Sequence, residues 1–129
     1  MGADLMEWFC QIEPPLSEEE ISARCKLRSL PEQCTSIYKV ENISADRLSA
    51  QIECVWGIFT VVFTPIRNGV RYTLANCPNA LQWTITSDRE ETLIHCSINQ
   101  KTTDPDFADS IRQLVEDFRR GLGSQTTEQ

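Results

Sequence analysis

DPDFADSIRQLVEDFRRGL, residues 104–122, is the stretch that decides the fold. Its apolar side chains recur at helical spacing, while charged and amide side chains fill the opposite side. The apolar stripe consists of Phe107, Ala108, Ile111, Leu114, Val115, Phe118 and Leu122. Asp104 is a good N-cap, Pro105 suits the first helical position, and Gly121 with Gly123 supplies the stop. The stretch therefore predicts one long amphipathic helix.

Upstream of this helix the apolar period changes from helical to alternating, which is typical of half-buried strands. Asn68-Gly69 between two such runs is a strong hairpin signal. The predicted strands span residues 5–12, 37–43, 48–54, 58–64, 70–74, 81–86 and 94–98. Short turns between neighbours force antiparallel pairing, so the pattern predicts a meander that needs a cover on one face.

A second helix is predicted near the start of the chain. Ser17 with Glu20 forms a capping box, and Pro31 ends the segment after about three turns. The fold class is therefore α+β: an antiparallel sheet of about six or seven strands, one short N-terminal helix and the long C-terminal helix. We expect one domain over residues 1–122 and a disordered tail over 123–129.

The charge of the chain excludes some classes of partner. The net charge is −7 and the sequence pI is about 4.7, so neither nucleic acid nor an anionic membrane surface is an expected partner. The first ten residues lack the basic start and apolar run of a signal peptide. No apolar run approaches the roughly 20 residues of a membrane helix. We expect a cytoplasmic protein without membrane insertion.

The six cysteines include no Cys-x-x-Cys pair, and the chain has one histidine. This spacing argues against a metal site and favours free, mostly buried thiols; no metal or cofactor is expected. His95 and Cys96 are adjacent on a strand and point to opposite faces, with Cys96 toward the core. They cannot form a Cys-His catalytic pair, and we assign no catalytic residue.

The aromatic residues of the strands have two interpretations. They fill an ordinary core between sheet and helix, or some of them line a cavity in which polar tips such as those of Tyr72 and Trp83 orient a ligand. Trp56 beside Gly57 marks a bend in a long strand. The candidate cavity-lining residues are Trp56, Phe59, Tyr72, Trp83, Phe107 and Ile111.

The order of elements resembles the helix-grip fold of the START and Bet v 1-like superfamily, which includes polyketide cyclases and small lipid-binding proteins. The likeness spans nearly the whole chain: an opening strand around Trp8, a helix begun by SEEE, Leu30-Pro31 before a strand, Gly57 within long strands, and the final helix. It implies a curved antiparallel sheet around the C-terminal helix, with a cavity between them. The chain departs from the pattern in having room for one short helix where the family often has two.

The expected function is that of a small non-enzymatic binding or carrier domain. It would hold an apolar small molecule or lipid between the sheet and the C-terminal helix. One alternative is a protein-interaction module, in which a homodimer is one expected form, that resembles the class I chaperones of type III secretion. Those chaperones begin with a helix, whereas this chain is predicted to begin with a strand. A second alternative is a cyclase-like enzyme that uses Tyr72 or His95 as acid or base in the same cavity.

Overall fold

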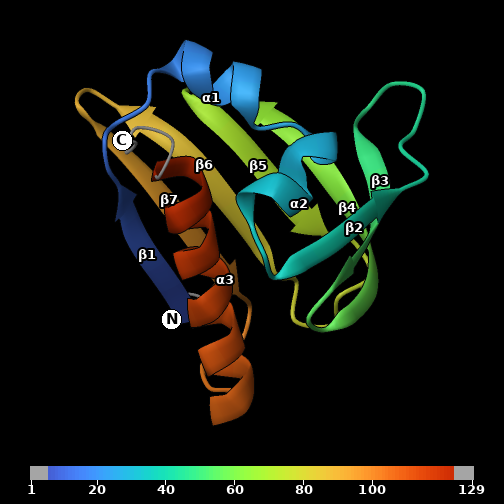
Figure 1. The fold of residues 1–129 in the computed structure, drawn as a ribbon. Helices are drawn as coiled ribbons and strands as arrows, with labels where there is room; N and C mark the ends of the chain where they lie inside the picture. The colour runs from blue at the N-terminus through green and yellow to red at the C-terminus, as the bar shows by residue number, and fades with distance from the viewer. Residues whose placement is uncertain (1–5, 124–129) are drawn as a thin grey trace.

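A seven-stranded antiparallel sheet carries all the helices on one face in the computed structural model, which describes residues 6–123 (Figure 1). The strands are β1 (Met6–Ile12), β2 (Ile37–Glu41), β3 (Ser49–Cys54), β4 (Gly57–Ile66), β5 (Gly69–Leu74), β6 (Gln82–Asp88) and β7 (Glu91–Ile98). Their order across the sheet is β1-β7-β6-β5-β4-β3-β2, so the first strand pairs with the last. The predicted α+β class and antiparallel meander are confirmed.

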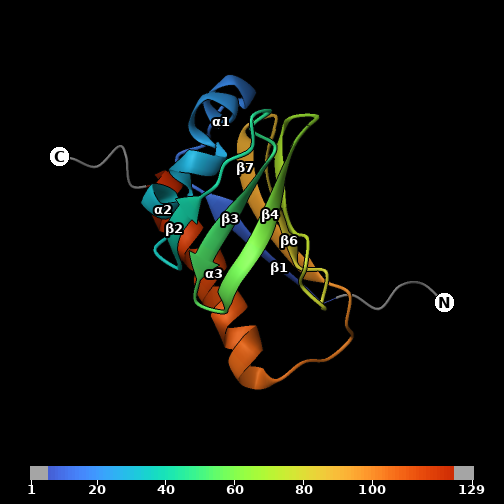
Figure 2. The same ribbon diagram turned by 90° about the vertical axis from the view of Figure 1, so that its right-hand side faces the viewer.

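The helices cover the inner face of the sheet in two groups (Figure 2). They are α1 (Glu18–Arg24), the 3-10 turn η1 (Leu27–Ser29), α2 (Leu30–Gln33) and α3 (Pro105–Gly123). α3 packs on β1 and β7, α1 packs on β5 and β6, and α2 lies between β2 and α3. The first turns of α3 extend past the end of the sheet (Figures 1 and 2). The order of strands and the final helix are compatible with helix-grip topology.

The predicted hairpin forms between β4 and β5. Asn68 takes a positive φ of 69°, which Asn tolerates better than most residues, and Gly69 begins the return strand. A Cβ on Gly69 would lie 1.9 Å from the carbonyl oxygen of Ile85 on β6. Glycine is therefore needed here for the close approach of two strands.

The structure corrects the prediction of a single N-terminal helix. The capping box is present, since Ser17 Oγ accepts from the Glu20 amide and Glu20 accepts from the Ser17 amide, but α1 has only 7 residues. Pro31 lies in the first turn of a further helix, α2, and does not end the segment. Proline lacks an amide hydrogen, and that hydrogen has no helical partner in a first turn, so the position tolerates it.

Two predictions about glycine were wrong. Gly57 does not bend one long strand: Val55 and Trp56 form a two-residue turn, and Gly57 with φ +118° begins β4. Gly121 does not stop α3, which continues to Gly123. A Cβ on Gly121 would lie 2.0 Å from the carbonyl oxygen of Gln33, so this glycine lets α3 approach α2. The rest of the expected tail, residues 124–129, lies outside the described residues.

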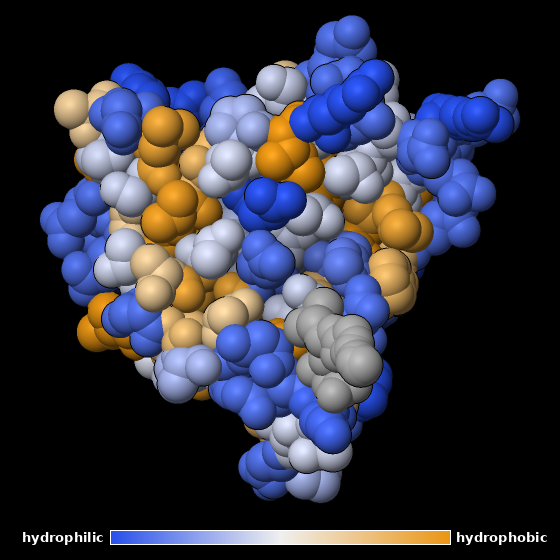
Figure 3. Space-filling view, turned by 180° about the vertical axis from the view of Figure 1, so that it is seen from behind, coloured by the Kyte–Doolittle hydropathy of each residue, from blue (hydrophilic) through white to orange (hydrophobic). Residues whose placement is uncertain are grey.

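The two faces of the sheet differ in composition. The inner face contributes the core, in which Tyr72, Trp83 and Cys96 occupy neighbouring positions on β5, β6 and β7. The outer face presents threonines, Gln82 and Arg71, and Figure 3 shows its apolar residues interspersed with polar ones. The hydrophobic core therefore lies between the sheet and the helices.

Candidate functional site

The space between the sheet and α3 is filled by aromatic rings. Tyr72 stacks on Trp83 at a centroid distance of 5.3 Å, and Trp83 packs on Phe118 of α3 at 5.6 Å. All three side chains are at most 1% exposed. Burial raises the pKa of Tyr72 well above its ordinary value near 10, so the phenol stays protonated at neutral pH. These rings form packed core.

The six residues predicted to line a cavity fall into two groups. Tyr72, Trp83 and Ile111 lie in the packed core. Trp56, Phe59 and Phe107 border a small apolar pocket of about 160 Å³ near the start of α3. The Trp56 Nε1–H donates to Ser110 Oγ at 2.7 Å, and its ring meets Phe107 edge-on at 5.6 Å. This contact fixes the first turns of α3, which extend past the sheet.

A larger pocket, of about 480 Å³, lies at the other end of the inner face, and we call it the hairpin pocket. Its floor is the β4–β5 hairpin, and its walls are α1, η1 and the 42–48 loop that joins β2 to β3. The apolar lining residues include Leu27, Ile43, Leu48, Phe63, Pro65 and Val70. None of the six residues predicted from sequence lines it.

The 42–48 loop has its own internal structure. Ser44 Oγ accepts from the amides of Leu48 and Ser49 at 3.2 and 3.1 Å, and the Arg47 amide donates to the carbonyl oxygen of Ser44 at 2.9 Å. The Phe63 amide on β4 donates to the carbonyl oxygen of Leu48 at 2.8 Å, which joins the loop to the sheet. These bonds hold Ile43 and Leu48 at the pocket while each remains 41% exposed.

Exposed apolar side chains that gather at a hollow are uncommon on a soluble surface and mark interaction sites. The sequence contains a weak indication of the hairpin pocket. Leu48 continues the inward parity of β3 beyond the strand, and Ile43 lies two residues past β2 on the other side of the turn. Their convergence on Leu27 of η1 depends on tertiary structure, which local periodicity does not encode.

The charged residues around the hairpin pocket differ in how they are engaged. The Asp46 carboxylate accepts from Ser44 Oγ at 2.5 Å and from the Leu48 amide at 3.0 Å; these bonds hold the pKa of Asp46 below its ordinary value. The Asn68 amide donates to Glu18 Oε2 at 3.2 Å. Lys26, Arg28 and Arg47 also line the pocket. The two acids are thus used in local structure.

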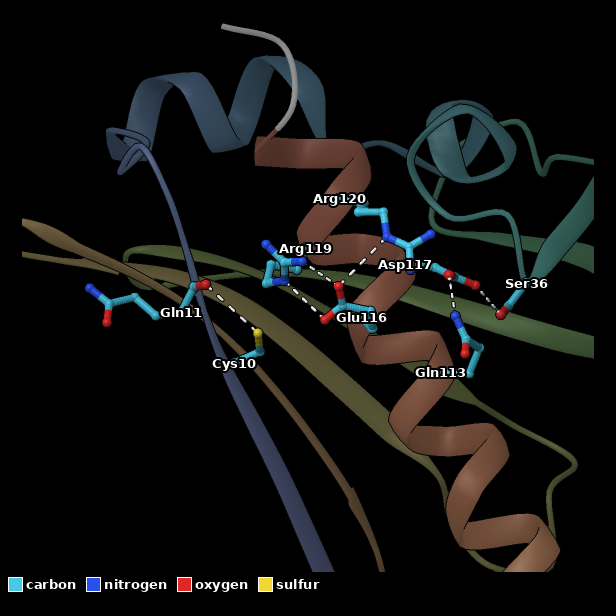
Figure 4. A network of polar contacts seen from close by, with 8 residues as sticks. All are labelled: Cys10, Gln11, Ser36, Gln113, Glu116, Asp117, Arg119 and Arg120. Atoms are coloured by element: carbon cyan, nitrogen blue, oxygen red, sulfur yellow. Dashed lines mark hydrogen bonds and ion pairs between the residues drawn. The ribbon is translucent and has the colours of Figure 1, made fainter. Parts of the chain in front are cut away.

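A buried polar cluster joins α3 to the segment between α2 and β2 (Figure 4). Asp117, only 6% exposed, accepts from Ser36 Oγ at 2.5 Å and from Gln113 Nε2 at 2.8 Å. Figure 4 shows Glu116 pointing away from this cluster, toward its ion pairs with Arg119 and Arg120. The buried carboxylate has its hydrogen bonds satisfied and lines neither pocket, so its role is to orient α3.

His95 lies on the outer face of the sheet, opposite the helices. Its ring stacks on Phe9 at 4.4 Å, and its Nε2 lies 2.7 Å from Glu7 Oε1. Cys96 is fully buried on the inner face, so the predicted opposite orientations of these two neighbours are confirmed. His95 lines neither the hairpin pocket nor the pocket at α3.

The cysteines are free thiols, as predicted, and four of the six are buried. Burial raises the pKa of Cys25, Cys34 and Cys96 to about 12, because the thiolate loses its solvation in the core. Burial also raises the pKa of Cys54. These thiols are inert residues of the core.

We expect N-ethylmaleimide at pH 8 to modify only the two half-buried thiols of the folded protein, Cys10 and Cys77, on the timescale of minutes. The thiolate is the reacting species, and at this pH Cys25, Cys34 and Cys96 hold only about one part in 10⁴ of it. Intact-mass spectrometry should show two adducts in buffer and six in urea. A third fast adduct in buffer would contradict the burial of the other four thiols.

Within residues 6–123 no cluster of three or more His, Cys, Asp or Glu side chains is placed to hold a metal ion. No helix in the described part of the chain is long and apolar enough to span a bilayer.

Comparison with known proteins identifies relatives in structure only. No protein-family model matches the chain, and no curated protein matches its sequence. The fold is similar to that of the protein XoxI from Bacillus cereus, with a TM-score of 0.64 and 14% identity over 93% of both chains. It is also similar to an uncharacterised protein from Bacillus thuringiensis, with a TM-score of 0.63 and 13% identity over 93% of this chain and 96% of that one. At such identity the likeness shows a shared fold and no more.

Proposed function

We propose that this chain is a small binding or carrier domain that holds an apolar ligand in the hairpin pocket. The pocket of about 480 Å³ carries the proposal, because ligand sites of proteins span about 300 to 1,000 Å³ and are mostly apolar. Burial of the ligand against Leu27, Phe63 and Val70 would supply the affinity. The walls belong to three separate elements, so a ligand would bridge η1 and the hairpin.

The proposed position differs from the one expected from the sequence, which lay between the sheet and α3. There the rings of Tyr72, Trp83 and Phe118 are in contact with one another. The hairpin pocket lies on the same face of the sheet but under α1 and η1. An entering molecule would contact side chains that are already partly exposed, such as Ile43 and Leu48, so no core side chain would have to move.

The test is a substitution that fills the pocket from its rim. Ser22 of α1 is exposed and lines the pocket, so Ser22→Trp places an indole over the floor without disturbing the core. We expect the affinity for decanol, a neutral apolar probe, to fall about tenfold or more, since a methylene lost from contact costs about 0.8 kcal/mol. Isothermal titration calorimetry gives the affinity directly.

Ala23→Trp is the matched control. Ala23 is the next residue of α1, is also exposed, and does not line the pocket. It should leave decanol binding unchanged, and decanol should raise the melting temperature of this variant as it does that of the wild type. Absence of decanol binding by the wild-type protein, or equal loss in both variants, would refute the proposed site.

The two alternatives from the sequence stay predictions. The interaction-module alternative rests on acidity and size. The cyclase-like alternative needs a titratable acid or base within the cavity, and of its two candidates Tyr72 lies in the packed core and His95 on the outer face.

A further inference from the structure

Three basic side chains line the hairpin pocket and have no partner among the residues that the structure describes. Lys26 immediately precedes η1, Arg28 lies within it, and Arg47 is at the tip of the 42–48 loop. Among residues 6–123, none of these side chains forms an ion pair or a hydrogen bond. All three are exposed and border the same hollow from two of its walls.

The acidic residues of the same pocket do not neutralise these cations. Asp46 accepts from Ser44 Oγ and the Leu48 amide, and Glu18 accepts from the Asn68 amide. The charged residues that line the pocket are therefore three cations and two acids, in a chain whose net charge is −7. The pocket lining therefore carries a net positive charge, whereas the protein as a whole carries a net negative charge.

We infer that the ligand of the hairpin pocket is a single-chain amphiphile whose anionic oxygen head group, a carboxylate or phosphate, is bound by Lys26, Arg28 and Arg47. The apolar tail would lie against Leu27, Phe63 and Val70, as in the proposed function. The assignment of the head group rests on that proposed function. Charge-assisted hydrogen bonds from ammonium and guanidinium groups to such oxygens are short and directional.

The overall charge limits the size of the anion. A polyanion would meet the repulsive field of the remaining acidic surface, whereas a single head group would meet a pocket lining of three cations and two acids. Arg47 suits this role because its backbone, at φ 64°, is fixed in a tight turn by the hydrogen bond from its amide to Ser44. The loop therefore holds the backbone of Arg47 at the pocket, so binding of the head group need not order this part of the chain.

The experiment compares decanoate with decanol, which share a tail and differ in the head group. Calorimetry at pH 8 and low salt should show decanoate binding more tightly than decanol to the wild-type protein. In the triple variant Lys26→Gln, Arg28→Gln, Arg47→Gln the affinity for decanoate should fall about tenfold or more, since each exposed ion pair contributes about 1.5- to 5-fold. Decanol binding should be unchanged, because the tail contacts remain.

Arg89→Gln is the matched control for the charge. Arg89 is also exposed in a tight turn at positive φ, 60° against 64° for Arg47, but it lies in the β6–β7 turn and does not line the hairpin pocket. Its substitution matches the Arg47→Gln part of the triple variant, because it removes one positive charge from the same backbone conformation. We expect decanoate affinity within about twofold of the wild type. Circular dichroism melts of both variants confirm that any loss is not unfolding.

The outcomes separate the head-group inference from the proposed function. If neither decanol nor decanoate binds, the proposed function fails. If both bind equally and the triple variant binds decanoate as the wild type does, the proposed pocket is retained and the inference of an anionic head group is overturned.

Three further probes test the chemistry of the head group. Decyl phosphate in place of decanoate tests the other head group, and inorganic phosphate alone tests a free anion. Decyltrimethylammonium should bind more weakly than decanol. Tight binding of inorganic phosphate without a tail would also contradict an amphiphile.

Discussion

Replacing Trp83 by alanine should lower the free energy of unfolding by about 3 to 5 kcal/mol, the range for large aromatic truncations in a core. Trp83 is 1% exposed and lies between Tyr72 and Phe118, so its ring connects the sheet to α3. Its removal would leave a cavity bordered by two rings that rigid strands and a helix hold in place. Urea unfolding followed by circular dichroism measures the loss.

Trp83→Phe and Ile58→Ala are the comparisons for this experiment. The Trp83 Nε1–H is buried and has no hydrogen-bond partner among the described residues, so phenylalanine removes an unsatisfied donor while it keeps most of the ring. We therefore expect Trp83→Phe to cost clearly less than Trp83→Ala. Ile58 is 57% exposed on β4, and its truncation should cost less than about 0.5 kcal/mol. A Trp83→Ala loss below 1 kcal/mol would mean that the rings repack freely.

Gly121→Ala should destabilise the protein, although helix propensity alone predicts a gain of about 1 kcal/mol for this change inside a helix. The added Cβ would lie 2.0 Å from the Gln33 carbonyl oxygen, which belongs to backbone and cannot rotate away. α3 or α2 must shift, and overpacking of this kind costs about 1 to 3 kcal/mol. The sign of the change therefore distinguishes local propensity from tertiary contact.

Arg120→Ala is the control in the preceding position of the same helix. The Arg120 side chain is 63% exposed and its ion pair with Glu116 is long, at 3.6 Å, so its loss should change the free energy of unfolding by less than about 0.5 kcal/mol. Thermal melts and urea unfolding should agree for both variants. A stabilised Gly121→Ala protein would show that α3 and α2 do not approach as closely as described.

The elements whose signals are local were predicted from the sequence. The α3 stripe, the capping box at Ser17 and the turn at Asn68 each place a chemical requirement within a few residues, so a short window suffices to read them. The opposite orientations of His95 and Cys96 were also predicted from a local signal, because successive side chains of a pleated strand point to opposite faces of the sheet.

The predictions that failed depended on distant parts of the chain. Gly121 was interpreted as a helix stop because glycine is common there, yet its reason is the Gln33 backbone, which the fold brings alongside. Pro31 was interpreted as the end of a helix, but proline also suits the first turn of a helix, and that is where it lies in α2. The hairpin pocket was missed altogether, since Lys26, Arg47 and Val70 are brought together only by the sheet and the helices above it.

The position of β1 beside β7 determines when the sheet can be completed during synthesis. Strands β2 to β7 pair in sequence order and close only short loops, whereas β1 must wait for a partner that leaves the ribosome after the five strands between them. Closing that long loop costs more entropy than closing any hairpin, and such distant contacts slow folding. The nascent chain therefore carries β1 unpaired and the inner face of the meander uncovered by α3, and its interval of greatest exposure to aggregation ends only when α3 docks.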